Sequence, residues 1–225
     1  MRPGKYRFIL IPLILFLVWS ILILEDGLSR ESGRAAVERL KYIPSGQTLR
    51  LITAGYHTLA ADLLWAWSVV SFGEHLNGDR EFGWLSKALE GVTALDPRFR
   101  DAYLYGGIML AMEAEDPEGA VKLLERGVKN IPSDWQLHFF LGFYRLLYRI
   151  DPIEGIASLK RAAMLPGHPP YLPLLVARSY TKLGMIRLAV SYLEQVRDMI
   201  SDPELKLRIE AQIAELLRRQ GVVPG

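Results

Sequence analysis

The chain has 225 residues, a formal net charge of +2 and no cysteine, and half of its residues are hydrophobic. The lack of cysteine excludes disulfides, thiolate metal sites and cysteine nucleophiles. A charge so close to balance, without a long basic run, argues against nucleic acid as a partner. The mean hydropathy of +0.14 is high for a wholly soluble protein, and the apolar excess is concentrated at the N-terminus.

The N-terminal apolar run predicts a membrane anchor. Residues 8–24, from Phe8 to Leu24, read FILIPLILFLVWSILIL and carry no charge, which reaches the lower length limit for a transmembrane helix. Residues 1–7 contain three basic side chains, and Glu25 and Asp26 follow the run. The positive-inside rule therefore predicts a single-pass protein with residues 1–7 cytoplasmic and the remainder extracytoplasmic, or periplasmic in a bacterium.

The alternative for this run is a cleaved signal peptide. A cleavable signal has a shorter apolar core, and a small-x-small site follows it. Here the run passes directly into Glu25 and Asp26 and no such site follows, so the sequence favours an uncleaved anchor.

Residues 25–47 form a polar linker, and a helix-like stretch follows at 48–76. Within it, residues 51–70 have two interpretations: a second membrane span, which would return the rest to the cytoplasm, or one or two buried helices. A charge at the centre of a span costs about 2.5–3.5 kcal/mol on insertion scales, and Asp62 stands there. The sequence therefore favours buried helices, with the aromatic side chains packed against neighbouring helices, namely Tyr56, Trp65 and Trp67.

Small residues recur with a nearly constant period after this stretch. Gly73, Gly107, Gly142 and Ala177 are 34, 35 and 35 residues apart. The unit 101–132 shows the fullest pattern, with small and large apolar residues at fixed spacings and a closing proline: Tyr103, Gly106, Gly107, Leu110, Ala120, Leu124 and Pro132. A small residue in each of two helices permits close approach, and the proline ends the second helix.

This spacing resembles that of the tetratricopeptide repeat (TPR) family over roughly residues 66–201. The resemblance implies an all-α solenoid of about four helix-turn-helix repeats, with the repeat region at 48–201. The chain departs from the family pattern at its first consensus tryptophan, which is replaced in each unit by Val69, Tyr103, His138 and Pro173.

Residues 202–220 predict a capping helix. Asp202 is a favourable N-cap, and Pro203 suits the first helical position. One side of the helix is apolar and the other sides are charged, as the end of a solenoid requires. The apolar stripe comprises Leu205, Ile209, Ile213, Leu216 and Leu217.

Catalytic and metal-binding patterns are missing from the sequence. The four histidines form no H-x-x-x-H or H-E-x-x-H pair, and no phosphate-binding glycine motif or nucleophile elbow occurs. The sequence therefore predicts no enzyme, no metal and no cofactor.

The TPR resemblance instead implies a groove lined by the first helix of each unit, suited to an amphipathic helix or an extended peptide. The alternative is that some of these residues belong to the core of so short an array. The predicted groove is apolar and aromatic, with a basic end: Leu104, Ile108, Phe139, Phe143, Leu147, Tyr171, Leu174, Arg178 and Lys182.

Two functions follow from this organisation. The first is a membrane-anchored TPR scaffold or adaptor that binds protein partners at the extracytoplasmic face. The alternative is an accessory or assembly subunit of a membrane-embedded complex, with residues 51–70 packed in or on the bilayer.

Overall fold

Ten helices and no strand occupy residues 46–219, the part of the chain that the computed structural model describes. The predicted anchor at 8–24, its flank at 1–7, the linker up to residue 45 and residue 220 of the capping segment lie outside the described residues. Their predictions are therefore untested.

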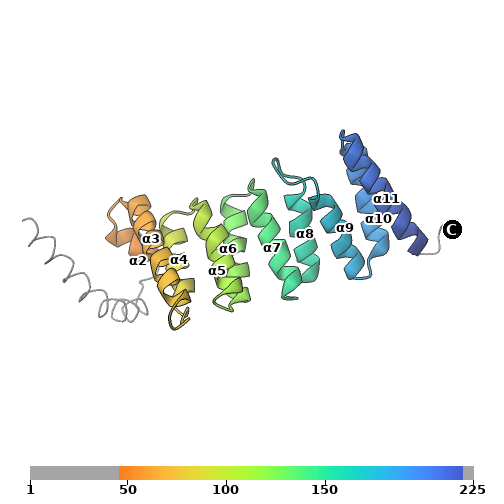
Figure 1. Ribbon diagram of the computed structural model, residues 1–225. Helices are drawn as coiled ribbons and strands as arrows, with labels where there is room; N and C mark the ends of the chain where they lie inside the picture. Colours follow the sequence, from red (N-terminus) through yellow and green to blue (C-terminus); the bar gives the residue numbers. More distant parts are fainter. Residues whose placement is uncertain (1–45, 220–225) are drawn as a thin grey trace, which may run out of the picture.

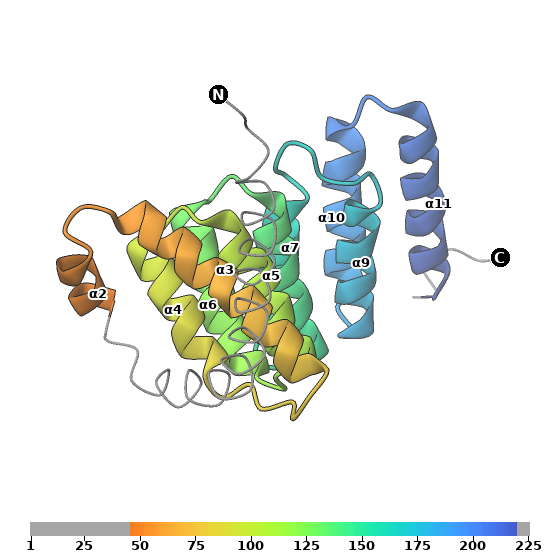
Figure 2. The same ribbon diagram turned by 60° about the vertical axis from the view of Figure 1, so that its left-hand side comes forward.

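The helices stand side by side in one elongated row (Figure 1). Four helical hairpins, α3/α4, α5/α6, α7/α8 and α9/α10, follow one another, and α11 packs against α10 (Figure 2). The all-helical, repeated architecture is as predicted. The helices are α2 (Gly46–Ile52), α3 (His57–Leu76), α4 (Leu85–Leu95), α5 (Arg100–Met112), α6 (Pro117–Asn130), α7 (Trp135–Leu147), α8 (Pro152–Ala162), α9 (Leu172–Lys182), α10 (Ile186–Met199) and α11 (Pro203–Arg219).

An aspartate followed by proline begins three of these helices, α6, α8 and α11. The carboxylates of Asp116, Asp151 and Asp202 each accept a hydrogen bond from a backbone N–H group in the first turn, at 2.8 to 3.1 Å. The proline that follows fixes φ near its helical value and removes a donor that would otherwise lack a partner. These helix starts are therefore specified locally.

Two glycines allow the close helix contacts that the repeat pattern predicts. A Cβ atom added to Gly107 would lie 3.1 Å from Cγ of Leu124 in α6, and one added to Gly142 would lie 2.6 Å from the carbonyl oxygen of Gly155 in α8. Because the second contact is with backbone, α7 and α8 approach too closely for any side chain at Gly142.

The same prediction is wrong for the first hairpin. A Cβ atom on Gly73 would meet no atom within 4 Å. Leu85 occupies the position in α4 that Ala120 and Gly155 occupy in later units, and it is fully buried. At this point α4 therefore makes no close contact with Gly73.

The apolar core follows the row in successive clusters. One cluster lies among α4–α7, a second among α8–α11, and a small third where the first half of α3 meets α4 and α5. In α11, Ile209, Ile213 and Leu216 are buried in the second cluster, and Asp202 caps the helix. A helix with one buried side thus occupies Pro203–Arg219, within the segment that the sequence predicts as a cap.

The stretch 48–76 is not one helix. It forms α2 and α3 with a turn between them, and its tryptophans pack as predicted: Trp65 lies 5.8 Å from the Phe99 ring and Trp67 lies edge-on, 5.1 Å from Trp84. The prediction for Tyr56 is wrong, because this side chain in the turn is 73% exposed.

Burial of this stretch is also one-sided. Large apolar residues along α2 and one side of α3 are more than half exposed: Leu51, Ile52, Tyr56, Leu59, Leu63 and Val70. The inner side of α3 packs against α4 and α5, but no described helix covers the outer side. Between residues 46 and 219, no helix is long and apolar enough to cross a membrane.

Candidate partner-binding surface

A stripe of apolar side chains runs along α7. Trp135, Phe139, Phe143 and Leu147 are spaced four residues apart, which places them on one side of a helix. The Phe139 and Phe143 rings are nearly parallel, with an interplanar angle of 12° and centroids 6.0 Å apart, and the Trp135 ring lies 6.4 Å from Phe139. Phe143 is 39% exposed and Leu147 more so. The stripe therefore presents an apolar, partly aromatic surface to solvent.

The neighbouring first helix, α9, adds positive charge. Arg178 and Lys182 are exposed and one turn apart, and neither side chain makes a hydrogen bond or ion pair with any other residue between 46 and 219. Leu174, one turn earlier, is half-buried against the second core cluster, which Phe139 also contacts. Tyr171 is exposed immediately before the helix. Along this side of α9, the side chains thus change from apolar to basic.

The third helix of the predicted groove, α5, contributes less. Leu104 is only 4% exposed and belongs to the first core cluster, so its side chain does not line the surface. Ile108 is half-buried. The hydroxyl group of Tyr148, just beyond α7, donates a hydrogen bond to the Ala111 carbonyl at 2.7 Å, which ties α7 to α5. Leu104 is therefore a core residue, which was the alternative for the predicted groove.

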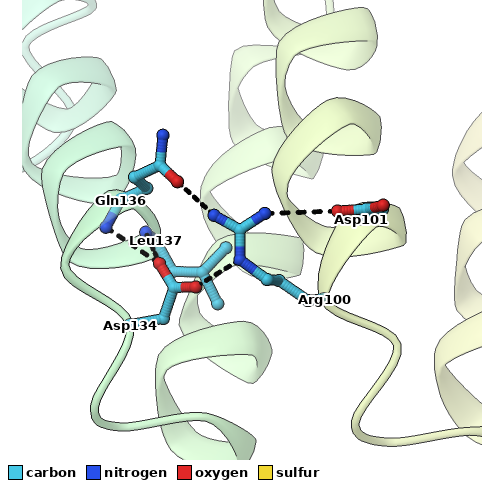
Figure 3. A network of polar contacts seen from close by, with 5 residues as sticks. All are labelled: Arg100, Asp101, Asp134, Gln136 and Leu137. Atoms are coloured by element: carbon cyan, nitrogen blue, oxygen red, sulfur yellow. Dashed lines mark hydrogen bonds and ion pairs between the residues drawn. The ribbon is translucent and has the colours of Figure 1, made fainter.

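A polar network fixes the start of α7 (Figure 3). One carboxylate oxygen of Asp134 accepts hydrogen bonds from the N–H groups of Gln136 and Leu137, at 2.9 and 3.1 Å, and so caps the helix. The other oxygen accepts from Nε of Arg100, the first residue of α5, at 2.5 Å. Arg100 also donates to the side-chain oxygen of Gln136 and to Asp101.

This network positions the aromatic stripe, because Trp135 follows Asp134 directly. Burial tends to lower the pKa of Arg100, but the hydrogen bond and charge of Asp134 outweigh that effect and raise it. The guanidinium group therefore remains a cation that holds α5 and α7 together at their N-terminal ends.

Sequence reasoning missed this pair, although a signal was present. Arg100 and Asp134 are 34 residues apart, which is one repeat period. Two other ion pairs between neighbouring hairpins span similar separations, Arg80–Glu113 at 33 residues and Glu90–Arg126 at 36. Opposite charges one period apart therefore mark contacts between units in this array.

The region from α8 to α10 is strongly cationic. No aspartate or glutamate occurs between Glu154 and Glu194, and this interval holds five basic residues: Lys160, Arg161, Arg178, Lys182 and Arg187. The whole chain carries only +2, so the charge is concentrated here. Such a field attracts an acidic partner at long range.

Two further features bear on the chemistry of this surface. Among the described residues, no three histidine, aspartate or glutamate side chains are grouped so that they could hold a metal ion. Every buried side-chain nitrogen or oxygen atom between residues 46 and 219 has a hydrogen-bond partner. What the α7 and α9 surface offers is apolar contact area and unpaired positive charge.

The described chain is an all-α array of TPR-like helical hairpins. No family model and no curated protein matches it. Among solved structures, it is similar to two crystal structures of MamA. One has 19% identity and a TM-score of 0.49, covering 75% of this chain and 85% of that one. The other has 20% identity and a TM-score of 0.45, covering 62% and 78%.

A thermophilic TPR protein from Thermus thermophilus, TTC0263, is 18% identical with a TM-score of 0.39, covering 76% of this chain and 98% of that one. At these identities and TM-scores, the similarities add nothing to what the hairpins of this chain show by themselves.

Proposed function

We propose that this protein is a membrane-anchored scaffold that captures a helix or extended segment of a protein partner at the extracytoplasmic face. The observation that carries the proposal is the exposed Phe143–Leu147 end of the α7 stripe beside the two cations of α9, Arg178 and Lys182.

The chemistry of this surface suits protein recognition. Partners gain most binding energy from aromatic and arginine side chains that lose water on contact. Phe143 is stacked on Phe139, so its ring is held in place before binding and loses little conformational freedom. The unpaired cations of α9 add a preference for acidic partners.

Substitutions on the α7 and α9 surface test the scaffold function. Phe143→Ala and Arg178→Glu each remove an exposed group, and we expect each to weaken partner capture by about tenfold. Leu207→Ala, at an exposed apolar position on α11, is the matched control. The measurement is recovery of co-purifying proteins with the full chain from detergent extracts. Unchanged recovery with both Phe143→Ala and Arg178→Glu would contradict the assignment.

Membrane attachment rests on the sequence alone. The uncharged run 8–24, the basic residues before it and the acidic residues after it support one span with an extracytoplasmic array. Reporter fusions at Gly33 and after Gly225 test the topology. We expect equal extracytoplasmic signals, and opposite signals from the two fusions would refute a single span.

The exposed apolar side of α2 and α3 favours a second candidate function, the accessory subunit of a membrane complex. The terminal units of a solenoid need a polar outer face. At the other end, α11 has one, but the α3 end exposes Leu59, Leu63 and Val70. Packing of residues 51–70 on the bilayer or on a membrane protein would cover them.

One comparison separates the two candidates. Leu63→Gln with Val70→Gln removes apolar contact from the α3 end without touching the α7 stripe. The subunit function predicts that this double variant loses co-purification with membrane proteins while Phe143→Ala retains it. The scaffold function predicts the reverse pattern.

A further inference from the structure

The second helices α8 and α10 form another exposed surface, which shares no residue with the predicted groove. Ile153, Met164 and Leu188 are each more than half exposed on this surface. Ile153 lies in the first turn of α8, Met164 follows its last turn, and Leu188 lies in the first turn of α10. Large exposed apolar side chains thus stand at both ends of α8 and at the start of α10.

These side chains border two adjoining hollows. The first, of about 480 Å³, lies between α8 and the start of α10 and is lined by Ile153, Ala157, Tyr180 and Leu188, among others. The second, of about 460 Å³, is lined by Tyr192, Val196 and Met199 of α10 and by residues of the α8–α9 loop. Met164 lines both hollows. The two hollows therefore adjoin at Met164, and together they are called the α8/α10 groove.

Charge in this groove is positive. Lys160 and Arg161 line the first hollow and no carboxylate does. The Lys160 ammonium group lies 5.6 Å from the centre of the Tyr192 ring, where the two hollows adjoin. In the second hollow, the one carboxylate is that of Asp202, which accepts hydrogen bonds from the N–H groups of α11.

We infer that this groove binds an acidic, amphipathic helix of a protein partner. The eleven residues of α8 span about 16 Å, which matches about three turns of a docked helix. Apolar side chains at i, i+3 or i+4 and i+7 of that helix would enter the hollows. Its carboxylates would meet Lys160 and Arg161. This inference does not depend on the proposed function, because the α7 and α9 surface has no part in it.

Two features favour a helix over a lipid surface. The apolar side chains border concave hollows, whereas a bilayer surface requires a convex or flat apolar face. The positive charge also stands inside the groove, at Lys160 over Tyr192, where it can meet carboxylates spaced along a helix.

The test uses the full chain in nonionic detergent and a synthetic fluorescent helix of about five turns, with leucine on one face and glutamate on the others. A matched peptide carries lysine in place of glutamate. Fluorescence anisotropy should show binding of the acidic peptide only. We expect Lys160→Glu with Arg161→Glu to weaken that binding about tenfold and to permit binding of the lysine peptide. Lys122→Glu with Lys129→Glu, at exposed positions of α6 outside both surfaces, should leave both affinities unchanged.

Three outcomes would overturn the inference. Equal binding of both peptides would show general apolar adhesion. Loss of binding in Arg178→Glu, with the Lys160→Glu and Arg161→Glu double variant unaffected, would place the peptide on the α7 and α9 surface. Failure of the acidic peptide to bind, together with binding of anionic phosphatidylglycerol vesicles that Leu188→Ser abolishes, would identify the groove as a lipid site. Circular dichroism of each variant separates these outcomes from unfolding.

Discussion

The carboxylate of Asp134 both caps a helix and links two hairpins, because each of its oxygens has a different partner. One oxygen caps α7, and the other holds Arg100 of the preceding hairpin. The side chain is only 12% exposed, so solvent screens this ion pair less than a surface pair. The angle at which α7 presents its stripe therefore depends on a residue that is not part of the stripe.

Substitutions of Asp134 separate capping from charge. Asp134→Ala removes both contacts, and we expect it to lower the free energy of unfolding by about 1–3 kcal/mol. Asp134→Asn keeps a good capping group and should cost less than half as much. Thermal unfolding followed by circular dichroism measures both variants. Equal losses would show that the ion pair, rather than the cap, stabilises this junction.

Because of Tyr144, the free energy of unfolding should fall at alkaline pH. Its side chain is almost fully buried, and burial, with a smaller effect of Tyr148, raises its pKa from 10.0 to about 12. Between these pH values the unfolded chain loses a proton that the folded chain keeps. The stabilising contribution is therefore complete below pH 10 and is lost as the pH rises toward 12.

Tyr144→Phe should reduce the fall in the free energy of unfolding at alkaline pH by about 2 kcal/mol, because phenylalanine does not ionise. Urea unfolding of both proteins at about pH 9 and about pH 11.5 measures the difference. Tyr103, whose pKa is also raised by burial, accounts for part of the remaining fall. An identical pH dependence in the two proteins would contradict the role of Tyr144.

At the scale of helices, the hairpins differ in how closely their members approach. In α7/α8 two glycines face each other, Gly142 and Gly155, and backbone meets backbone. In α3/α4 the equivalent Gly73 faces empty space. The same residue at the same repeat position thus has different surroundings in the two hairpins.

This difference predicts that replacing glycine by alanine has opposite effects on stability in the two hairpins. Gly142→Ala places a Cβ atom 2.6 Å from the Gly155 carbonyl oxygen, so the helices must separate, at a cost of about 1–3 kcal/mol. Gly73→Ala adds a methyl group in open space and should stabilise α3 by about 0.5–1 kcal/mol. Denaturant unfolding of the two variants tests both signs. Destabilisation by Gly73→Ala would contradict the open packing of the first hairpin.

For the whole molecule, the repeat period predicts the number and order of the hairpins. Small residues at a fixed period and aspartate–proline starts are local signals, because backbone geometry and close approach require them. The part of the candidate surface that α7 contributes is also predictable from the spacing of its residues. Phe139, Phe143 and Leu147 share one side of α7 as their four-residue spacing requires.

Other features depend on how neighbouring units pack, which spacing does not specify. Leu104 has the same repeat position as Phe139, yet it is buried in the first core cluster whereas Phe139 is half-buried. Tyr56 is exposed because it lies in the turn between α2 and α3, and the sequence left open whether one helix or two would form there. In both cases the outcome depends on contacts with another element.

Site-specific photo-crosslinking in cells shows whether the α7 and α9 surface of this array receives a partner. A photoreactive residue is placed at Phe143, at Lys182 or, as a control, at Leu207, all of which are exposed. We expect Phe143 and Lys182 to crosslink to the same protein and Leu207 to crosslink to none. Crosslinks confined to Leu207, or different proteins at Phe143 and Lys182, would contradict a single binding surface on the first helices.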